Sequence, residues 1–181
     1  MPRWPQNLGV KRDTVISTPH LCAPYFREFS VMRNDGWASA TWPLANQAIF
    51  VPFELDRPMR VTSAWWVNGN ALASASADIG VYTADGTKLY SSGAVVLAGT
   101  NAYQTTGLGL PLTLPRGALY LALAVSSVSA QMYVYNPSNI GSDFACFMLG
   151  QASAFPLPAV ATFAAYATQR VPYCGLTGRT F

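Results

Sequence analysis

Residues 77–91 read ADIGVYTADGTKLYS, and this stretch decides the fold class. From Ala77 to Thr83 apolar and polar side chains alternate, which is the period of a β-strand with one buried face. Asp85-Gly86 follows, a strong tight-turn signal because glycine accepts the positive φ that such turns require. Residues 87–91 supply the returning strand. The stretch predicts a hairpin whose inward side chains are Ala77, Ile79 and Val81 and whose outward side chains are Asp78 and Tyr82.

Similar short runs recur on both sides of this hairpin, separated by turn residues at intervals of about 8–12 positions. They lie at 48–53, 59–67, 94–98, 110–114, 118–126, 131–135 and 144–149. No helical period separates them, and a parallel sheet would need crossover helices. The sequence therefore predicts an all-β, antiparallel β-sandwich of the jelly-roll type. In the run 59–67, strict alternation places Trp65 toward the core and Trp66 outward.

The chain divides into three zones. Prolines interrupt residues 1–45 and exclude a long helix or a central strand, so we predict an extended N-terminal docking arm there. Residues 46–149 form the sandwich domain. Residues 150–181 are apolar and rich in alanine, proline and aromatics, and they predict an extended C-terminal arm that packs into a groove or pairs with the edge of a neighbour. The arms would dock through Trp4, Phe26, Trp37, Trp42, Phe155 and Phe163.

The composition favours a component of an assembly. Of the 181 residues, 51% are hydrophobic and only 10% are charged, against roughly 25% charged in an average soluble domain. Much of the surface must therefore be uncharged, and large apolar surfaces usually contact a partner. The net charge is +3 without a Lys/Arg-rich run, so we expect no direct nucleic-acid binding.

The sequence gives no sign of membrane insertion or export. The longest apolar run, Ala118–Val125, is far shorter than the roughly twenty residues that span a bilayer. The first residues, MPRWPQNLG, lack the apolar segment of a signal peptide. We expect synthesis in a cytoplasm and no membrane span.

Four segments carry a family resemblance: SATWP at 39–43 with 48–53 and 59–62, ADIGVYTADGTKL at 77–89, LPRGALYLAL at 114–123, and FPLPA at 155–159. In that order they resemble the opening, the hairpin, the strand that follows and the closing segment of the small β-sandwich virion proteins of tailed bacteriophages. The resemblance covers roughly residues 37–177. It implies a structural role in a virion (a fibre, a tail adaptor or a capsid decoration, commonly a trimer) and brings no catalytic residues.

We therefore expect a non-enzymatic virion subunit, assembled in the host cytoplasm. It would be a fibre or tail-attached component that forms a homotrimer and docks by its arms on capsid, portal or tail-adaptor proteins. Two alternatives stay open, a capsid decoration or cement protein and a carbohydrate-binding module that attaches to a host surface glycan. Either an interface or a glycan platform would use outward aromatic side chains. The candidates are Trp66, Tyr82, Tyr120, Tyr133 and Tyr135.

No catalytic, cofactor or metal site is predicted. The single histidine, His20, lies beside Cys22 in the proline-rich arm, where a held nucleophile pair is not expected. Glu54 and Asp56 could serve glycoside hydrolysis, but neighbouring arginines make salt bridging the simpler interpretation. A Ca²⁺ site at Asp78 and Asp85 lacks the usual loop motif. The three cysteines, Cys22, Cys146 and Cys174, form no CxxC pattern and are expected to be buried thiols.

Overall fold

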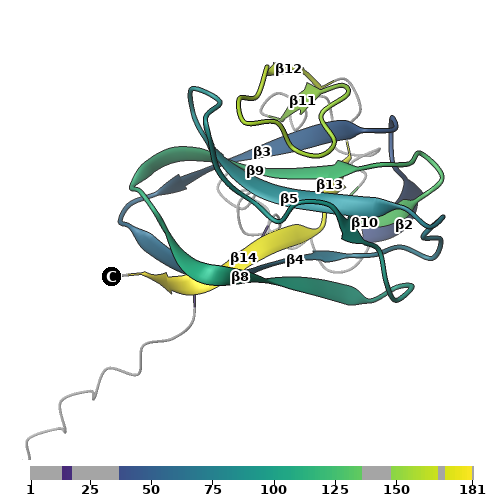
Figure 1. Ribbon diagram of the computed structural model, residues 1–181, viewed down its shortest axis with the longest axis horizontal. Coiled ribbons are helices and arrows are strands. Elements are labelled where there is room, and N and C mark those ends of the chain that lie inside the picture. The colour runs from purple at the N-terminus through teal and green to yellow at the C-terminus, as the bar shows by residue number, and fades with distance from the viewer. Residues whose placement is uncertain (1–13, 18–36, 136–147, 167–169, 181) are drawn as a thin grey trace, which may run out of the picture.

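The computed structural model describes residues 14–17, 37–135, 148–166 and 170–180, and every regular element within these ranges is a β-strand. All strand pairs are antiparallel, so the predicted all-β antiparallel class is confirmed (Figure 1). The strands are β1 (Thr14–Ser17), β2 (Trp37–Thr41), β3 (Gln47–Leu55), β4 (Met59–Val67), β5 (Ser76–Thr83), β6 (Lys88–Ser91), β7 (Val95–Val96), β8 (Tyr103–Leu114), β9 (Gly117–Val125), β10 (Gln131–Tyr135), β11 (Leu149–Gln151), β12 (Ala164–Ala165), β13 (Val171–Pro172) and β14 (Cys174–Thr180).

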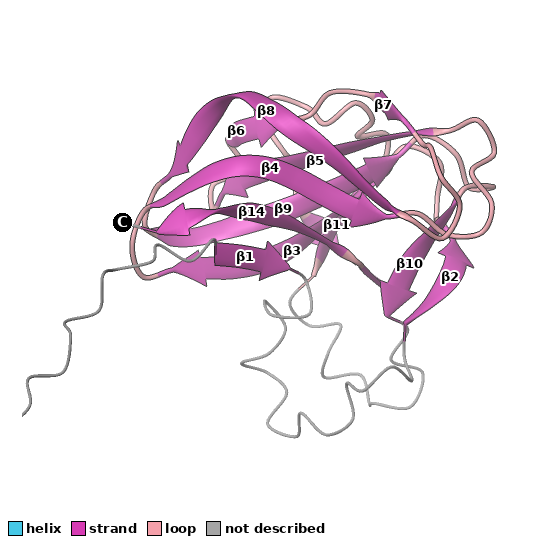
Figure 2. Cartoon of the chain, turned by 90° about the horizontal axis from the view of Figure 1, so that it is seen from below, coloured by secondary structure: helices cyan, strands magenta, loops and turns pink. Residues whose placement is uncertain are grey.

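The strands form three sheets arranged as a sandwich. One layer is a seven-stranded sheet in the order β12-β11-β3-β9-β5-β6, with β7 also paired to β5. The opposite layer contains a four-stranded sheet in the order β1-β14-β4-β8, and beside it a three-stranded sheet in the order β13-β10-β2. Figure 2 shows the four-stranded sheet in front of the seven-stranded one. The jelly-roll topology itself stays a prediction.

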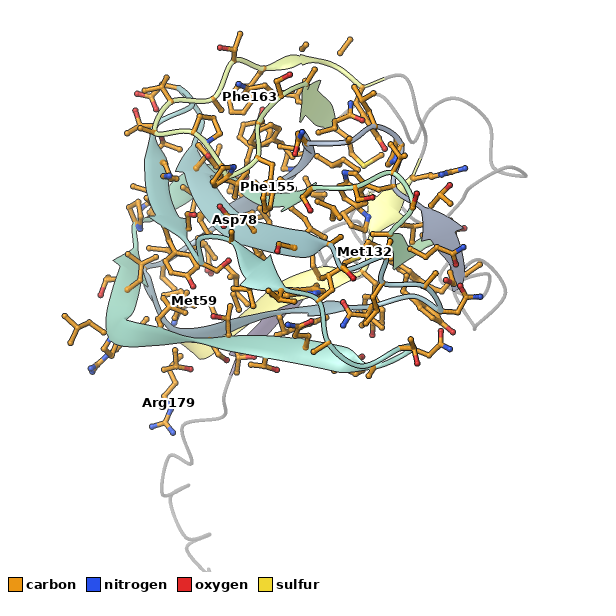
Figure 3. All side chains as sticks on the ribbon, turned by 45° about the vertical axis from the view of Figure 1, so that its right-hand side comes forward. Met59, Asp78, Met132, Phe155, Phe163 and Arg179 are labelled. Carbon is orange, nitrogen blue, oxygen red and sulfur yellow. The ribbon has the colours of Figure 1, made fainter. Side chains whose placement is uncertain are left out.

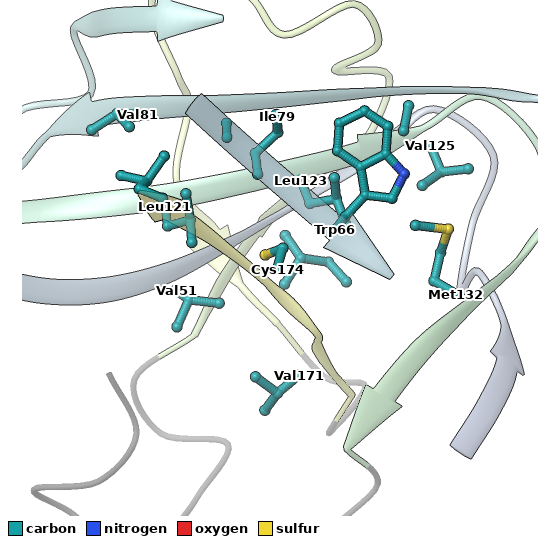
Figure 4. Close-up of a cluster of buried hydrophobic side chains, with 14 of the residues drawn as sticks. Val51, Trp66, Ile79, Val81, Leu121, Leu123, Val125, Met132, Val171 and Cys174 are labelled. Carbon is teal, nitrogen blue, oxygen red and sulfur yellow. The ribbon is translucent and has the colours of Figure 1, made fainter. Parts of the chain in front are cut away.

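The main core fills the space between these layers. Strands β3, β5 and β9 send alternate side chains into it, including Val51, Ile79 and Leu121, all at most 2% exposed (Figure 4). Strand β4 contributes Trp66 from the other side, and Cys174 of β14 lies beside it, also fully buried. The predicted burial of this cysteine is therefore confirmed, whereas Cys22 and Cys146 lie outside the described residues.

The hairpin at 77–91 forms as predicted. Strand β5 pairs with β6, and Asp85-Gly86 makes the turn with Gly86 at φ 88°. Backbone bonds close it, from the Thr83 amide to the Thr87 carbonyl (2.9 Å) and from the Gly86 amide to the Thr83 carbonyl (3.0 Å). The Asp85 carboxylate accepts hydrogen bonds from the Thr83 hydroxyl and the Thr87 amide, which lower its pKa. Local turn chemistry therefore sets this part of the fold.

The predicted orientation of the two adjacent tryptophans is wrong. The pairing of β4 shifts register on both sides at Thr62, against β14 and against β8. Such a bulge adds one residue and reverses which side chains face inward beyond it. Met59 and Val61 face the core before the bulge, and after it Ala64 and Trp66 do so. Trp65 therefore lies on the outer face of the four-stranded sheet.

The described parts of both predicted arms belong to the sandwich. Residues 37–41 form β2, and Trp42 is 1% exposed with its indole N–H donating to the Gln47 carbonyl (2.9 Å). Residues 37–42 of the predicted arm are thus packed into the sandwich. At the other end, β14 lies between β1 and β4, so residues 174–180 are an integral strand of this chain's own sheet.

Residues 152–163, here called the strap, cover the outer face of the seven-stranded sheet. Ala154, Leu157 and Ala161 pack in a second apolar cluster with Phe50 and Tyr82, which point away from the main core. The strap therefore covers an apolar face of its own molecule, and packing of this segment on a neighbour stays a prediction. The strap packs there because β3, β5 and β9 are buried on both faces of the sheet and their outward side chains need an apolar cover.

Candidate functional site

Two members of the predicted aromatic platform are buried. Trp66 is fully buried and donates its indole N–H to Asn68 Oδ1 (2.9 Å). Tyr82 does point outward from its sheet, as predicted, but it lies beneath the strap and is 0% exposed. Its hydroxyl donates to the Pro158 carbonyl (2.6 Å), and burial raises its pKa. Neither side chain is available to a ligand in this structure.

Three further predicted residues gather at the strap. Phe163 packs edge-on against Phe50 (ring centroids 5.1 Å apart) and in a tilted arrangement against Tyr120 (4.6 Å). Phe155 packs on the same apolar cluster, and Figure 3 shows it with Phe163 on the side of the molecule opposite Arg179. Phe155 and Phe163 are therefore side chains of the strap that pack on the sheet, and Tyr120 belongs to the sheet face beneath it. Trp4 and Phe26 lie outside the described residues.

The strap is held at a buried carboxylate. Asp78 is 0% exposed and accepts hydrogen bonds from the Ser91 hydroxyl (2.8 and 2.9 Å), the Ser92 hydroxyl (3.1 Å) and the Leu157 amide (2.9 Å). The Lys88 ammonium donates to the Leu157 carbonyl (2.7 Å). The hydrogen bonds that Asp78 accepts all come from donors within the protein. Asp78 is therefore a structural group that anchors the strap.

The remaining acidic residues considered for chemistry do not converge on a site. Asp56 forms a salt bridge to Arg57 (3.6 Å) on an exposed loop, as expected. Across the described ranges, no group of three or more His, Cys, Asp or Glu side chains is placed to hold a metal ion. The same ranges contain no helix long and apolar enough to cross a membrane. His20 and Cys22 lie outside the described residues.

An aromatic cluster does lie where the outer face of the four-stranded sheet meets β2 of the three-stranded sheet. It consists of Trp37, Trp65, Tyr103 and Tyr173. Tyr173 sits at its centre, with ring centroids 4.6 Å from Trp37, 5.6 Å from Trp65 and 6.0 Å from Tyr103. The Tyr103 hydroxyl donates to the Tyr173 hydroxyl (3.0 Å), and burial, with this contact, raises the pKa of Tyr173 to about 12. Tyr103 is 61% exposed and gives the cluster an open side.

Of the predicted platform residues, Tyr135 alone has a described ring contact with this cluster. Tyr135 is 5% exposed and packs against Trp37 with ring centroids 5.5 Å apart. Tyr133 is half-buried on the same strand, β10. Tyr103 and Tyr173 were not predicted, because they belong to no long alternating run and only strand pairing brings them together.

The other end of this face carries two arginines. Arg179 of β14 and Arg60 of β4 are directly paired across the strands, and both are exposed. Together with Thr62 and Pro111 they line a hollow of about 250 Å³, called here the arginine hollow. Figure 3 shows Arg179 projecting away from the sandwich.

The edge of this sheet is also unusual. Strand β8 is the last in the sheet order, and its twelve residues, YQTTGLGLPLTL, contain no charge. Its pairing with β4 is interrupted between Gly107 and Leu112. Within that interruption Leu110 is 83% exposed, the most exposed of the large apolar side chains described. Soluble sandwiches usually protect such edges with charged residues.

Comparisons with known proteins give little direct guidance. No protein-family model matches the chain, and no curated protein matches it. Among solved structures, one that matches is the crystal structure of the infectious bursal disease virus VP2 subviral particle. The identity is 14% and the TM-score 0.37, over 94% of this chain. This chain spans 42% of the length of that one, and a TM-score this low does not establish a common fold.

Proposed function

We propose that this chain is a non-enzymatic structural subunit of a tailed-phage virion, a fibre or tail-attached component that self-associates through its β-sandwich. The observation that carries the proposal is the uncharged edge strand β8 with Leu110 at 83% exposure. An edge strand has unpaired backbone donors and acceptors, and a second chain can pair with them. Apolar anchors such as Leu110 and Tyr103 would then be buried between copies.

The sequence supports the same assignment. Only 10% of the residues are charged, and the resemblance to phage β-sandwich proteins implies a structural role. We propose a homotrimer, with residues 1–36 docking on other virion proteins such as a capsid, portal or tail-adaptor protein. The alternative position is that of a capsid decoration protein. Labelling the chain in purified particles and locating it by electron microscopy distinguishes the tail from the capsid surface.

The self-association is tested at Leu110. Replacing it by lysine places a charge at the centre of the proposed contact without disturbing the core, because the side chain is exposed in the single chain. The matched control is Val160→Lys, at a residue that is 63% exposed and belongs to the strap on the outer face of the seven-stranded sheet. L110K should dissociate the oligomer in light scattering, and V160K should not.

The docking role of the N-terminus has its own test. Deleting residues 1–36 removes β1, an edge strand, and leaves β2–β14. We expect the shortened chain to keep its β-type circular dichroism and its oligomeric mass but to be absent from purified particles. Incorporation at the wild-type level would assign docking to another part of the molecule.

A second candidate function is a carbohydrate-binding module that acts in host-receptor attachment. The aromatic cluster favours it, because exposed tyrosine and tryptophan rings bind the apolar faces of sugars. Tyr103 is the accessible member and is already oriented by its bond to Tyr173. Under this proposal Tyr103→Ala removes binding on a glycan array, whereas Tyr120→Ala, at the strap, leaves it intact.

A further inference from the structure

Six large apolar side chains are exposed among the described residues: Leu44, Val96, Tyr103, Leu110, Val128 and Val160. Three of them lie at β8, the strand of the proposed contact. Tyr103 and Leu110 belong to it, and Val96 of β7 lies beside its start, because the Gln104 side chain donates to the Val96 carbonyl (2.7 Å). Val160 stands alone on the strap. The remaining two, Leu44 and Val128, belong to neither surface.

Leu44 and Val128 lie on neighbouring loops, one between β2 and β3 and the other between β9 and β10. The two loops are joined by a backbone hydrogen bond from the Trp42 amide to the Ala130 carbonyl (3.0 Å), and β3 pairs with β9 where the loops meet these strands. The side chains are 47% and 44% exposed. Together they are called here the loop patch, an apolar surface carried on a rigid part of the sandwich.

The end of the sandwich that carries the loop patch is uncharged. Neither of its two loops contains a charged residue. Glu54, Arg60 and Arg116 lie at the opposite end, where β3 ends, β4 begins and β8 turns into β9. Charged residues are depleted from the cores of protein interfaces. The loop patch is therefore suited to contact another uncharged surface, such as β8.

A ring of three identical chains places a requirement on its contacts. A twofold axis allows one patch to meet the same patch on the partner, whereas a threefold ring needs one surface of each chain to meet a different surface of the next. In the function proposed above, β8 supplies the first surface. The second surface must lie elsewhere on the same chain.

We propose that the loop patch is this second surface and that it receives the β8 edge of the next chain, with Leu110 packed against Leu44 and Val128. The inference rests on the homotrimer proposed above and names the surface that completes it. Figure 2 shows β2 and β10 well apart from the middle of β8, so one chain can present the two surfaces to two different neighbours.

The experiment measures the molar mass of the full-length chain and its variants by light scattering after size exclusion. Leu44→Lys and Val128→Lys test the loop patch. Asn70→Lys and Val160→Lys are matched controls, since both side chains are exposed and Asn70 follows β4 at the same end of the sandwich as the patch. A further sample mixes Leu110→Lys with Val128→Lys, because each of these variants keeps one of the two surfaces intact.

We expect both patch variants to run as single chains at concentrations where the wild type is a trimer, and both controls to remain trimers. The mixture should form a species of two chains, because the intact β8 edge of one variant meets the intact loop patch of the other. Circular dichroism on every variant checks that the sandwich is folded.

A trimeric Val128→Lys overturns the inference, and so does a mixture that stays at the mass of one chain at the highest concentration measured. If Leu110→Lys dissociates while Val128→Lys stays trimeric, the self-association through β8 stands and this inference alone is rejected. A wild-type chain that is itself a monomer rejects both.

Discussion

Removing the buried Asp78 carboxylate should release the strap. In Asp78→Ala, the Ser92 hydroxyl keeps a bond to the Gly93 carbonyl (2.9 Å), but the Ser91 hydroxyl and the Leu157 amide lose their acceptor. An orphaned buried donor costs about 1–3 kcal/mol. Relief of the carboxylate's own desolvation offsets part of this. We expect the free energy of unfolding to fall by about 3 kcal/mol.

Two companion variants separate hydrogen bonding from charge. Asp78→Asn keeps an oxygen that can accept from the Leu157 amide, and the Ser91 hydroxyl can rotate to accept from the new amide. Its loss should be about 1 kcal/mol. Glu54→Ala removes a carboxylate that is exposed on β3, and it should change stability by less than about 0.5 kcal/mol.

Urea unfolding measures these differences, and amide hydrogen exchange locates them. In Asp78→Ala the Leu157 amide should exchange much faster, while amides in the centre of β9 change only with global stability. The reasoning is refuted if Asp78→Ala unfolds within about 0.5 kcal/mol of the wild type. It is also refuted if exchange at Leu157 is unchanged.

The remaining predictions test the packing and the titration of the described residues. Gly80→Ala should destabilise the protein by at least about 2 kcal/mol, because a Cβ there would lie 2.7 Å from Leu157 Cδ1 and 2.6 Å from the Tyr90 carbonyl oxygen; Gly107→Ala, where the space is open, is the control in urea unfolding. The pKa of Tyr173 is raised to about 12, so the stability that its neutral hydroxyl contributes is fully present below pH 10 and is lost as the pH rises through 12. In Tyr173→Phe the free energy of unfolding should fall less steeply over that pH range, and an unchanged slope would contradict the assignment of this raised pKa to Tyr173. Truncation after residue 169 should leave the chain unfolded, because it removes β14 from between β1 and β4. Circular dichroism checks this, and a folded product would show that β14 is dispensable.

Much of the fold follows from local pattern. The hairpin at 77–91 forms as expected because alternation and turn chemistry act over a few residues. The ranges predicted for 59–67 and 131–135 coincide with β4 and β10. These strands have a regular apolar period and clear turn residues on both sides, which is the information that a sequence carries most directly.

The orientation of Trp65 and Trp66 could not be predicted from the apolar period. One inserted residue at Thr62 reverses the inward face of β4 beyond it. Bulges depend on the pairing of neighbouring strands that are distant in sequence, and period alone does not reveal them. The prediction therefore placed Trp66 outward and Trp65 toward the core, whereas Trp66 faces the core and Trp65 lies on the outer face of the sheet, 8% exposed.

The candidate site could not be predicted either, because it depends on contacts between segments that are distant in sequence. Residues 152–163 are apolar because they cover a sheet of their own chain, and low charge by itself does not say which surface an apolar segment covers. The aromatic cluster joins Trp37, Trp65, Tyr103 and Tyr173, which are spread over more than 130 positions of the sequence. Only the tertiary arrangement brings such residues together.

The central claim, self-association through the edge of the sandwich, is tested most directly by the molar mass of the purified chain. Light scattering after size exclusion should give three times the 19.4 kDa of one chain, independent of concentration. The same measurement on Leu110→Lys should give a single chain, and Val160→Lys should match the wild type. A wild-type protein that stays at 19.4 kDa throughout the concentration range would contradict the account.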